Sequence, residues 1–131
     1  MPLYTIEATY RLPVYRQRTY EATTSEAACE LAIADEGWGD GKEDVETSGE
    51  TYVTGIWKGR TAYAGTTIAV PDRFDETIQR KADFFDDLLA LLKEPARPMG
   101  LSRHEFEHWL PRAMATIAKA DAIVADAARG R

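Results

Sequence analysis

The residues best suited to do chemistry are the two histidines, which lie in one pentapeptide, His104-Glu105-Phe106-Glu107-His108. On a helix, histidines of an H-E-x-x-H motif share a face and can bind one metal ion. Glu105, between them, can take a proton from a metal-bound water molecule. The motif therefore marks His104 and His108 as candidate zinc ligands, and Glu105 as the candidate catalytic residue of a zinc-dependent hydrolase.

A catalytic zinc ion needs a third protein ligand, and the sequence places none close to the motif. The acids that follow it, Asp121 and Asp126, belong to the same helical segment. On a continuous helix Asp121 would lie roughly 20 Å along the axis from His108. Acids of the preceding helix, such as Asp87 or Glu94, would have to turn away from the core side of that helix.

The pentapeptide also fits a purely structural role. It resembles the motif of zinc peptidases, but those families usually carry an uncharged residue where Glu107 stands. Ser102 and Glu105 form a capping box, in which each side chain bonds the backbone amide of the other at a helix start. The histidines then lie on a solvated helix face and pair with neighbours three or four residues away. Between the catalytic and the purely structural interpretation lies a third: His104 and His108 bind a metal ion at the surface without catalysis.

Tyrosines alternate with arginines near the N-terminus, a combination found on sheets that stack single-stranded bases. The residues are Tyr10, Tyr15, Tyr20, Arg11, Arg16 and Arg18. With a turn at Arg11-Leu12-Pro13-Val14, Tyr10 would face Tyr15 and Glu7 would face Arg18, as cross-strand energetics favour. A formal net charge of −6 opposes phosphate binding by the rest of the surface. A single-strand binder is therefore a second alternative, and nucleic acid is not the expected partner.

Length and composition limit the class of protein. The chain has 131 residues, enough for one domain and too few for two. Cys29 is its single cysteine, so no internal disulfide can form, which fits a reducing compartment. The sequence shows no leader peptide and no apolar run of membrane-spanning length. We therefore expect one cytoplasmic domain, residues 1–131, that makes no membrane contact.

The first half of the chain predicts an antiparallel sheet with one short helix. Apolar and polar residues alternate over residues 4–12, as in a half-buried strand. Residues 50–58 and 62–70 are rich in β-favouring side chains and predict two further strands, joined at Gly59-Arg60. A capping box that begins at Thr23 opens the helix. About four strands are expected in total.

Past Pro71 the apolar spacing becomes helical. Residues 72–93 predict an amphipathic helix with its apolar side made of Phe74, Ile78, Phe85, Leu88, Leu89 and Leu92. A last helix begins near Ser102, and its core side comprises Phe106, Leu110, Ala113, Ile117 and Val124. Pro111 should kink or divide this helix. Its many alanines make it slim, so it can approach a neighbour closely within the domain or across a dimer.

These elements predict an α+β fold, with the sheet and first helix in residues 1–70 and an antiparallel helical hairpin in residues 72–131. Apart from the H-E-x-x-H motif, no catalytic pattern is visible in the sequence. We therefore expect a small, soluble, acidic protein that acts by protein–protein binding or self-association. Its acidic surface suits a protein partner with a basic face, or a second copy. No cofactor is expected, and zinc belongs only to the hydrolase alternative.

Overall fold

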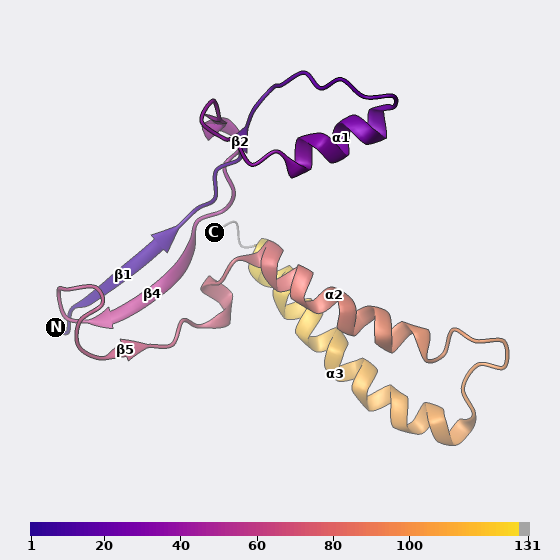
Figure 1. Cartoon of the computed structure of the whole chain (residues 1–131). Coiled ribbons are helices and arrows are strands. Elements are labelled where there is room, and N and C mark those ends of the chain that lie inside the picture. The colour runs from indigo at the N-terminus through magenta and orange to yellow at the C-terminus, as the bar shows by residue number, and fades with distance from the viewer. Residues whose placement is uncertain (129–131) are drawn as a thin grey trace. The chain divides into compact units, whose positions relative to one another are not determined.

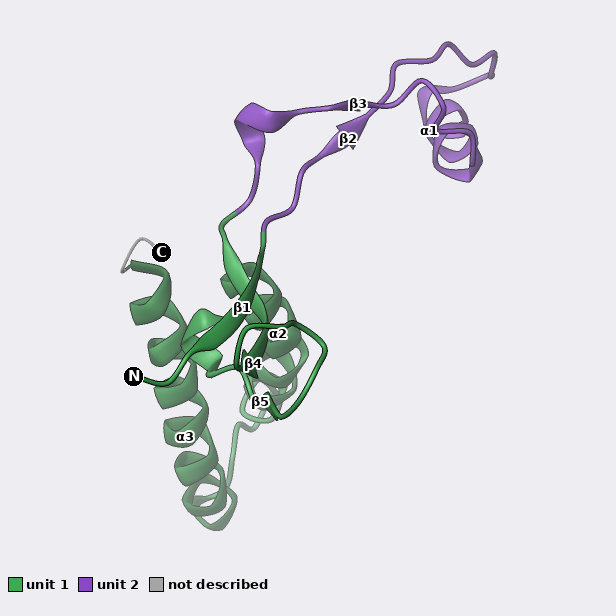
Figure 2. Ribbon diagram, turned by 90° about the vertical axis from the view of Figure 1, so that its left-hand side faces the viewer, with its two compact units in different colours: residues 1–9, 50–131 green, residues 10–49 purple. Residues whose placement is uncertain are grey.

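The computed structural model describes residues 1–128, which form an α+β fold of short strands and three α-helices. The chain divides into two compact units (Figure 2). Unit 1 comprises Met1–Thr9 and Glu50–Arg131, and unit 2 comprises Tyr10–Gly49. No helix in the described part of the chain is long and apolar enough to cross a membrane. The single domain expected for residues 1–131 stays a prediction.

Unit 1 contains a three-stranded antiparallel sheet in the order β1-β4-β5 (Figure 1). Its strands are β1 (Tyr4–Thr9), β4 (Tyr52–Lys58) and β5 (Thr67–Ile68). Ile6 of β1 lies opposite Ile56 of β4. The three strands correspond to the three segments that alternation and β-favouring composition predict.

The predicted hairpin between the first strand and the segment that follows it is wrong. Val14–Tyr15 forms β2, which pairs with β3 (Lys42–Glu43) in a separate two-stranded sheet. Glu7 consequently lies opposite Gly55 rather than Arg18. The longer pairing prevails because β4 offers β1 a full-length partner, whereas the segment after the turn supplies only two strand residues.

An aromatic pair lies on one side of this sheet. Trp57 is only 4% exposed, and its ring lies so close to Gly55 that a Cβ there would be 2.3 Å from a ring carbon. Tyr63 contacts Trp57 in a tilted arrangement, with ring centroids 4.6 Å apart and an angle of 49° between the ring planes. Tyr63 belongs to the connection between β4 and β5, residues 59–66, which is longer than the expected turn at Gly59-Arg60. That longer loop is what allows Tyr63 to reach the Trp57 ring.

The C-terminal part of unit 1 is the expected helical hairpin. Helix α2 (Thr77–Lys93) and helix α3 (Arg103–Ala128) lie side by side in both ribbon views (Figures 1 and 2). A short 3₁₀ turn, Asp72–Phe74, precedes α2. The backbone amide and hydroxyl of Thr77 both donate to the carboxylate of Glu50, which ties the start of α2 to the residues before β4.

Helix α3 continues through Pro111 as one helix. Of the two outcomes expected at this residue, a kink or a division, the division is therefore wrong. A proline removes one intrahelical hydrogen bond, at a cost of about 3 kcal/mol in a helix interior. Trp109 and Ala113, on either side of it, both pack toward α2 and hold the two parts of the helix on one partner. Packing against α2 therefore offsets the loss.

Unit 2 holds the remaining elements. Helix α1 (Ser25–Ala34) begins one residue later than expected, because the hydroxyl of Thr24, and not that of Thr23, accepts from the Ala27 amide at 3.1 Å. A 3₁₀ turn, Val45–Thr47, follows β3. None of the buried hydrophobic residues of the described chain belongs to unit 2. This unit must therefore be held together by other contacts.

Candidate functional site

The two histidines lie near the start of α3 and are exposed. Their ring centroids are 4.6 Å apart in an edge-to-face arrangement, so they share a helix face as the motif predicts. Neither ring is hidden beneath another element. A metal ion bound by His104 and His108 would therefore be open to solvent on the side away from the helix.

Glu105, the candidate base, is engaged in structural contacts. Its carboxylate pairs with the Arg97 guanidinium and accepts from the Ser102 amide, while the Ser102 hydroxyl accepts from the Glu105 amide at 3.2 Å. The capping box is thus confirmed. Arg97, followed by Ser102, lowers the pKa of Glu105 to about 2. A carboxylate stabilised in its charged form by these contacts is a weak general base.

A catalytic zinc ion would need a third protein ligand beside the two histidines. Within residues 1–128, no three or more His, Cys, Asp or Glu side chains gather in an arrangement that could hold a metal ion. Two of the acids weighed as ligands are occupied: Asp126 pairs with Arg80 at 2.9 Å, and Glu94 with Arg112 at 2.7 Å. Zinc binding by His104 and His108 stays a prediction that rests on these two side chains alone.

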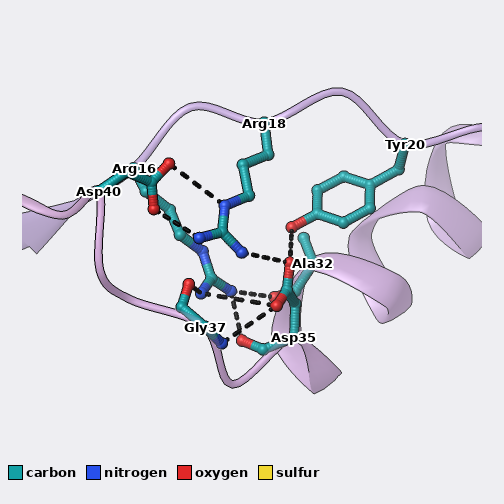
Figure 3. A network of polar contacts seen from close by, with 7 residues as sticks. All are labelled: Arg16, Arg18, Tyr20, Ala32, Asp35, Gly37 and Asp40. Carbon is teal, nitrogen blue, oxygen red and sulfur yellow. Dashed lines mark hydrogen bonds and ion pairs between the residues drawn. The ribbon is translucent and has the colours of Figure 1, made fainter.

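Arg16 and Arg18 of the N-terminal Tyr/Arg segment belong to unit 2 and take part in a network of polar contacts (Figure 3). Arg16 donates to the carbonyl oxygens of Ala32, Asp35 and Gly37 at 2.5–2.8 Å. These carbonyl groups lie at and just beyond the C-terminus of α1, where a cation is favoured. The guanidinium also lies over the Trp38 ring, 3.8 Å from its centroid. Arg16 therefore ends the helix and joins it to the following loop.

Arg18 bridges two carboxylates in the same network (Figure 3). It bonds Asp35 at 2.7 Å and Asp40 at 2.5 Å, and Asp35 also accepts from the Tyr20 hydroxyl at 2.7 Å. Phosphate binding by Arg16 or Arg18 would have to break contacts that hold unit 2 together. Their positions give the single-strand alternative little support, because the hairpin that was to present them has not formed.

The two helices of the hairpin pack through Trp109 and a row of mostly small side chains on α3. On α3 the residues turned toward α2 follow a 4-3 spacing: Trp109, Ala113, Thr116, Ala120, Ile123 and Ala127. Ala113 and Ile123 are buried, and the Trp109 indole nitrogen donates to the Leu91 carbonyl oxygen at 2.9 Å. Alanines at this seam allow close approach, as expected for a slim helix.

Ten large apolar side chains of the hairpin remain 39–70% exposed. They are Ile78, Phe85, Leu88, Leu89 and Leu92 on α2, and Phe106, Leu110, Met114, Ile117 and Val124 on α3. We call this set the hairpin face. All of them except Met114 were expected on the core side of their helices, and that expectation is wrong. Periodicity correctly predicted that each helix has an apolar side, but these side chains are exposed instead of packed in the core.

Both halves of the hairpin face lie on the same side of the hairpin. On α3, at 100° per residue, the exposed stripe lies roughly 100° from the seam residues in the direction of advancing sequence. On α2 the exposed stripe has the same offset from Phe84 and Leu91, which are less exposed. Because the helices run antiparallel, this rotation turns both stripes to one side. The ion pairs Arg80–Asp126 and Glu94–Arg112 bridge the helices on the opposite side. The hairpin thus has one apolar and one charged surface.

The size of the hairpin face sets it apart from ordinary surface. An aromatic side chain presents roughly 150–250 Å² when free and an aliphatic one less, so ten that are 39–70% exposed present on the order of 1,000 Å². The surfaces of monomeric proteins rarely show apolar patches larger than a few hundred Å². The sequence contains a pattern that could have predicted this face: α3 has one row of large apolar residues and, next to it, a second row of small residues.

Comparison with known protein families, with curated proteins and with solved structures gave no match for this chain.

Proposed function

We propose that this protein acts by binding another protein chain through the hairpin face. The observation that carries the proposal is the gathering of ten exposed, large apolar side chains on one side of two packed helices. Burial of apolar area is the main driving force of protein association. A surface of this extent therefore favours a macromolecular partner.

The surroundings of the hairpin face support a protein partner. Protein interfaces have an apolar centre and a polar, solvent-accessible rim. Helical spacing places Asp86 and Lys93 of α2, and Glu107 of α3, at the outer edges of the apolar stripes. The face is also broad and made of helix sides, which suits another helical or flat surface. A cytoplasmic location, with the single exposed thiol of Cys29 kept reduced, fits this role.

Zinc-dependent hydrolysis has weaker support. The histidine pair can contact a metal ion, but Glu105 is held by Arg97 and Ser102. Zinc analysis of tag-free wild-type protein and of the His104→Ala/His108→Ala variant shows whether the histidine pair binds zinc or has only a structural role. One zinc ion per chain, lost in the variant together with a hydrolytic activity, would overturn this ranking.

The proposal can be tested by placing a photo-crosslinking phenylalanine analogue in the hairpin face. Phe85 is 62% exposed at the centre of the face, and Ala90 lies on the other side of the same helix, where it lines a hollow with Arg112. We expect the analogue at position 85 to yield a discrete covalent adduct between protein chains after irradiation in cells. The same analogue at position 90 is expected to yield none.

Two outcomes would contradict the proposal. One is the absence of any interchain adduct at position 85 when the protein is abundant and folded. The other is an equal yield at positions 85 and 90, because it would show collision without a preferred surface.

A further inference from the structure

The dimensions of the hairpin face match those of a second hairpin. The apolar stripe of α2 extends from Ile78 to Leu92 and that of α3 from Phe106 to Val124. At 1.5 Å per residue these stripes are roughly 20 and 27 Å long. The face is therefore two helices wide and about four turns long. An antiparallel hairpin with the same face is half of a four-helix bundle.

The apolar part of each helix is also too wide for a hairpin alone. On α3, the seam residues and the exposed stripe together cover roughly 180° of the circumference, and α2 shows a similar width. A helix with one packed neighbour needs an apolar arc of about 100°. A helix of a four-helix bundle packs against two neighbours and needs a wider arc. The seam fills one side of this arc, and the hairpin face is left for the second neighbour.

We propose that the partner of the hairpin face is a second copy of this chain, and that two faces pack together as a four-helix bundle. This inference rests on the proposed function, because it names the occupant of the same surface. A twofold-symmetric dimer brings identical patches together, so the patch must be self-complementary. Long aliphatic and aromatic side chains on two parallel ridges satisfy that condition, since they interdigitate without needing a matching charge.

The area and the local charge agree with a second copy. Stable interfaces bury about 800 Å² on each partner, and the hairpin face offers on the order of 1,000 Å². The charged residues that interrupt the stripes, Lys81 on α2 and Asp121 on α3, have opposite signs. The face itself is thus not strongly acidic, although the chain carries a formal net charge of −6. Like-charge repulsion between copies is therefore weak where they would meet.

The test is the mass of the full chain in solution, measured by sedimentation over a wide range of concentration. We expect the wild type to have twice the chain mass of 14.6 kDa. Phe85→Lys places a charge at the centre of the hairpin face and should raise the dissociation constant tenfold or more. Ala90→Lys adds the same charge on the opposite side of α2 and should sediment as the wild type does.

The outcomes decide between the occupants. A wild type that stays monomeric at every concentration overturns the inference, as does a dimer that Phe85→Lys leaves intact. If Phe85→Lys loses its helical circular dichroism, Leu92→Lys replaces it, because Leu92 is 65% exposed at the end of the stripe. A monomer that still forms a position-85 adduct with a different protein would leave the proposed function standing and exclude self-association. A monomer without an adduct would contradict both.

Discussion

Asp35 is the residue on which the polar network of unit 2 converges. Its carboxylate accepts from the Tyr20 hydroxyl, the Arg18 guanidinium and the Gly37 amide. The Tyr20 and Arg18 contacts, in that order, hold the pKa of Asp35 well below its usual range. Because unit 2 has no buried hydrophobic residue among residues 10–49, this network replaces an apolar core. The charged form of Asp35 therefore stabilises the fold of the unit.

We expect Asp35→Asn to lower the thermal midpoint of unit 2 at neutral pH. A carboxyl group with a depressed folded pKa contributes stability above its unfolded pKa of about 4, and loses it as the pH falls toward the folded value. The wild type should therefore lose stability below about pH 4, and the variant should lose less. Circular dichroism melts at pH 7 and pH 3 measure both effects. Glu36→Gln, at the adjacent exposed position, is the control, and equal behaviour of the two variants would contradict this role.

Among the elements, the helical hairpin depends on a seam at which Ala113 and Ile123 of α3 are buried. Ala113 is 3% exposed and lies opposite α2, whereas Ala118, on the same helix, is exposed. Small residues at such positions set the distance between helix axes, because interiors are close-packed. The alanines of α3 consequently have different roles according to the side on which they lie.

We expect Ala113→Leu to destabilise the hairpin by about 1–3 kcal/mol, because a larger side chain at this buried position must displace the residues packed against it. Ala118→Leu should change the free energy of unfolding by no more than about 0.5 kcal/mol, as is usual for an exposed site. Urea unfolding followed by helical circular dichroism gives both values. Similar values for the two variants would show that α2 and α3 do not pack through Ala113.

For the whole chain, stability should depend on protein concentration. If two hairpin faces bury each other, association stabilises the folded form by mass action. The thermal midpoint of the wild type should therefore rise with concentration, while that of Phe85→Lys should not. Ala90→Lys should follow the wild type. Scanning calorimetry at several concentrations provides the measurement, and a constant wild-type midpoint would argue against association through the hairpin face.

Features whose partners lie close in the chain could be predicted from the sequence. Ser102 and Glu105 cap α3 because their mutual bonds span only three residues. His104 and His108 share a face because helical geometry alone brings them together. The α+β class and the approximate spans of β1, β4, α2 and α3 follow from periodicity, which is also a local property.

Only the tertiary structure decided which of these segments meet. Strand β1 pairs with β4, more than forty residues away, and Arg16 finds its acceptors around the end of α1. Contacts between segments so far apart in the chain require a long loop to close, and the local pattern of apolar residues does not show which loops close. The hairpin face is a second case in which the local sequence pattern does not identify the contact. Hydrophobic burial is non-directional, so an apolar stripe shows that a surface must be covered without identifying what covers it. Here Ala113 and Ile123 of α3 are buried, whereas Phe106, Leu110 and Ile117 of the same helix remain exposed.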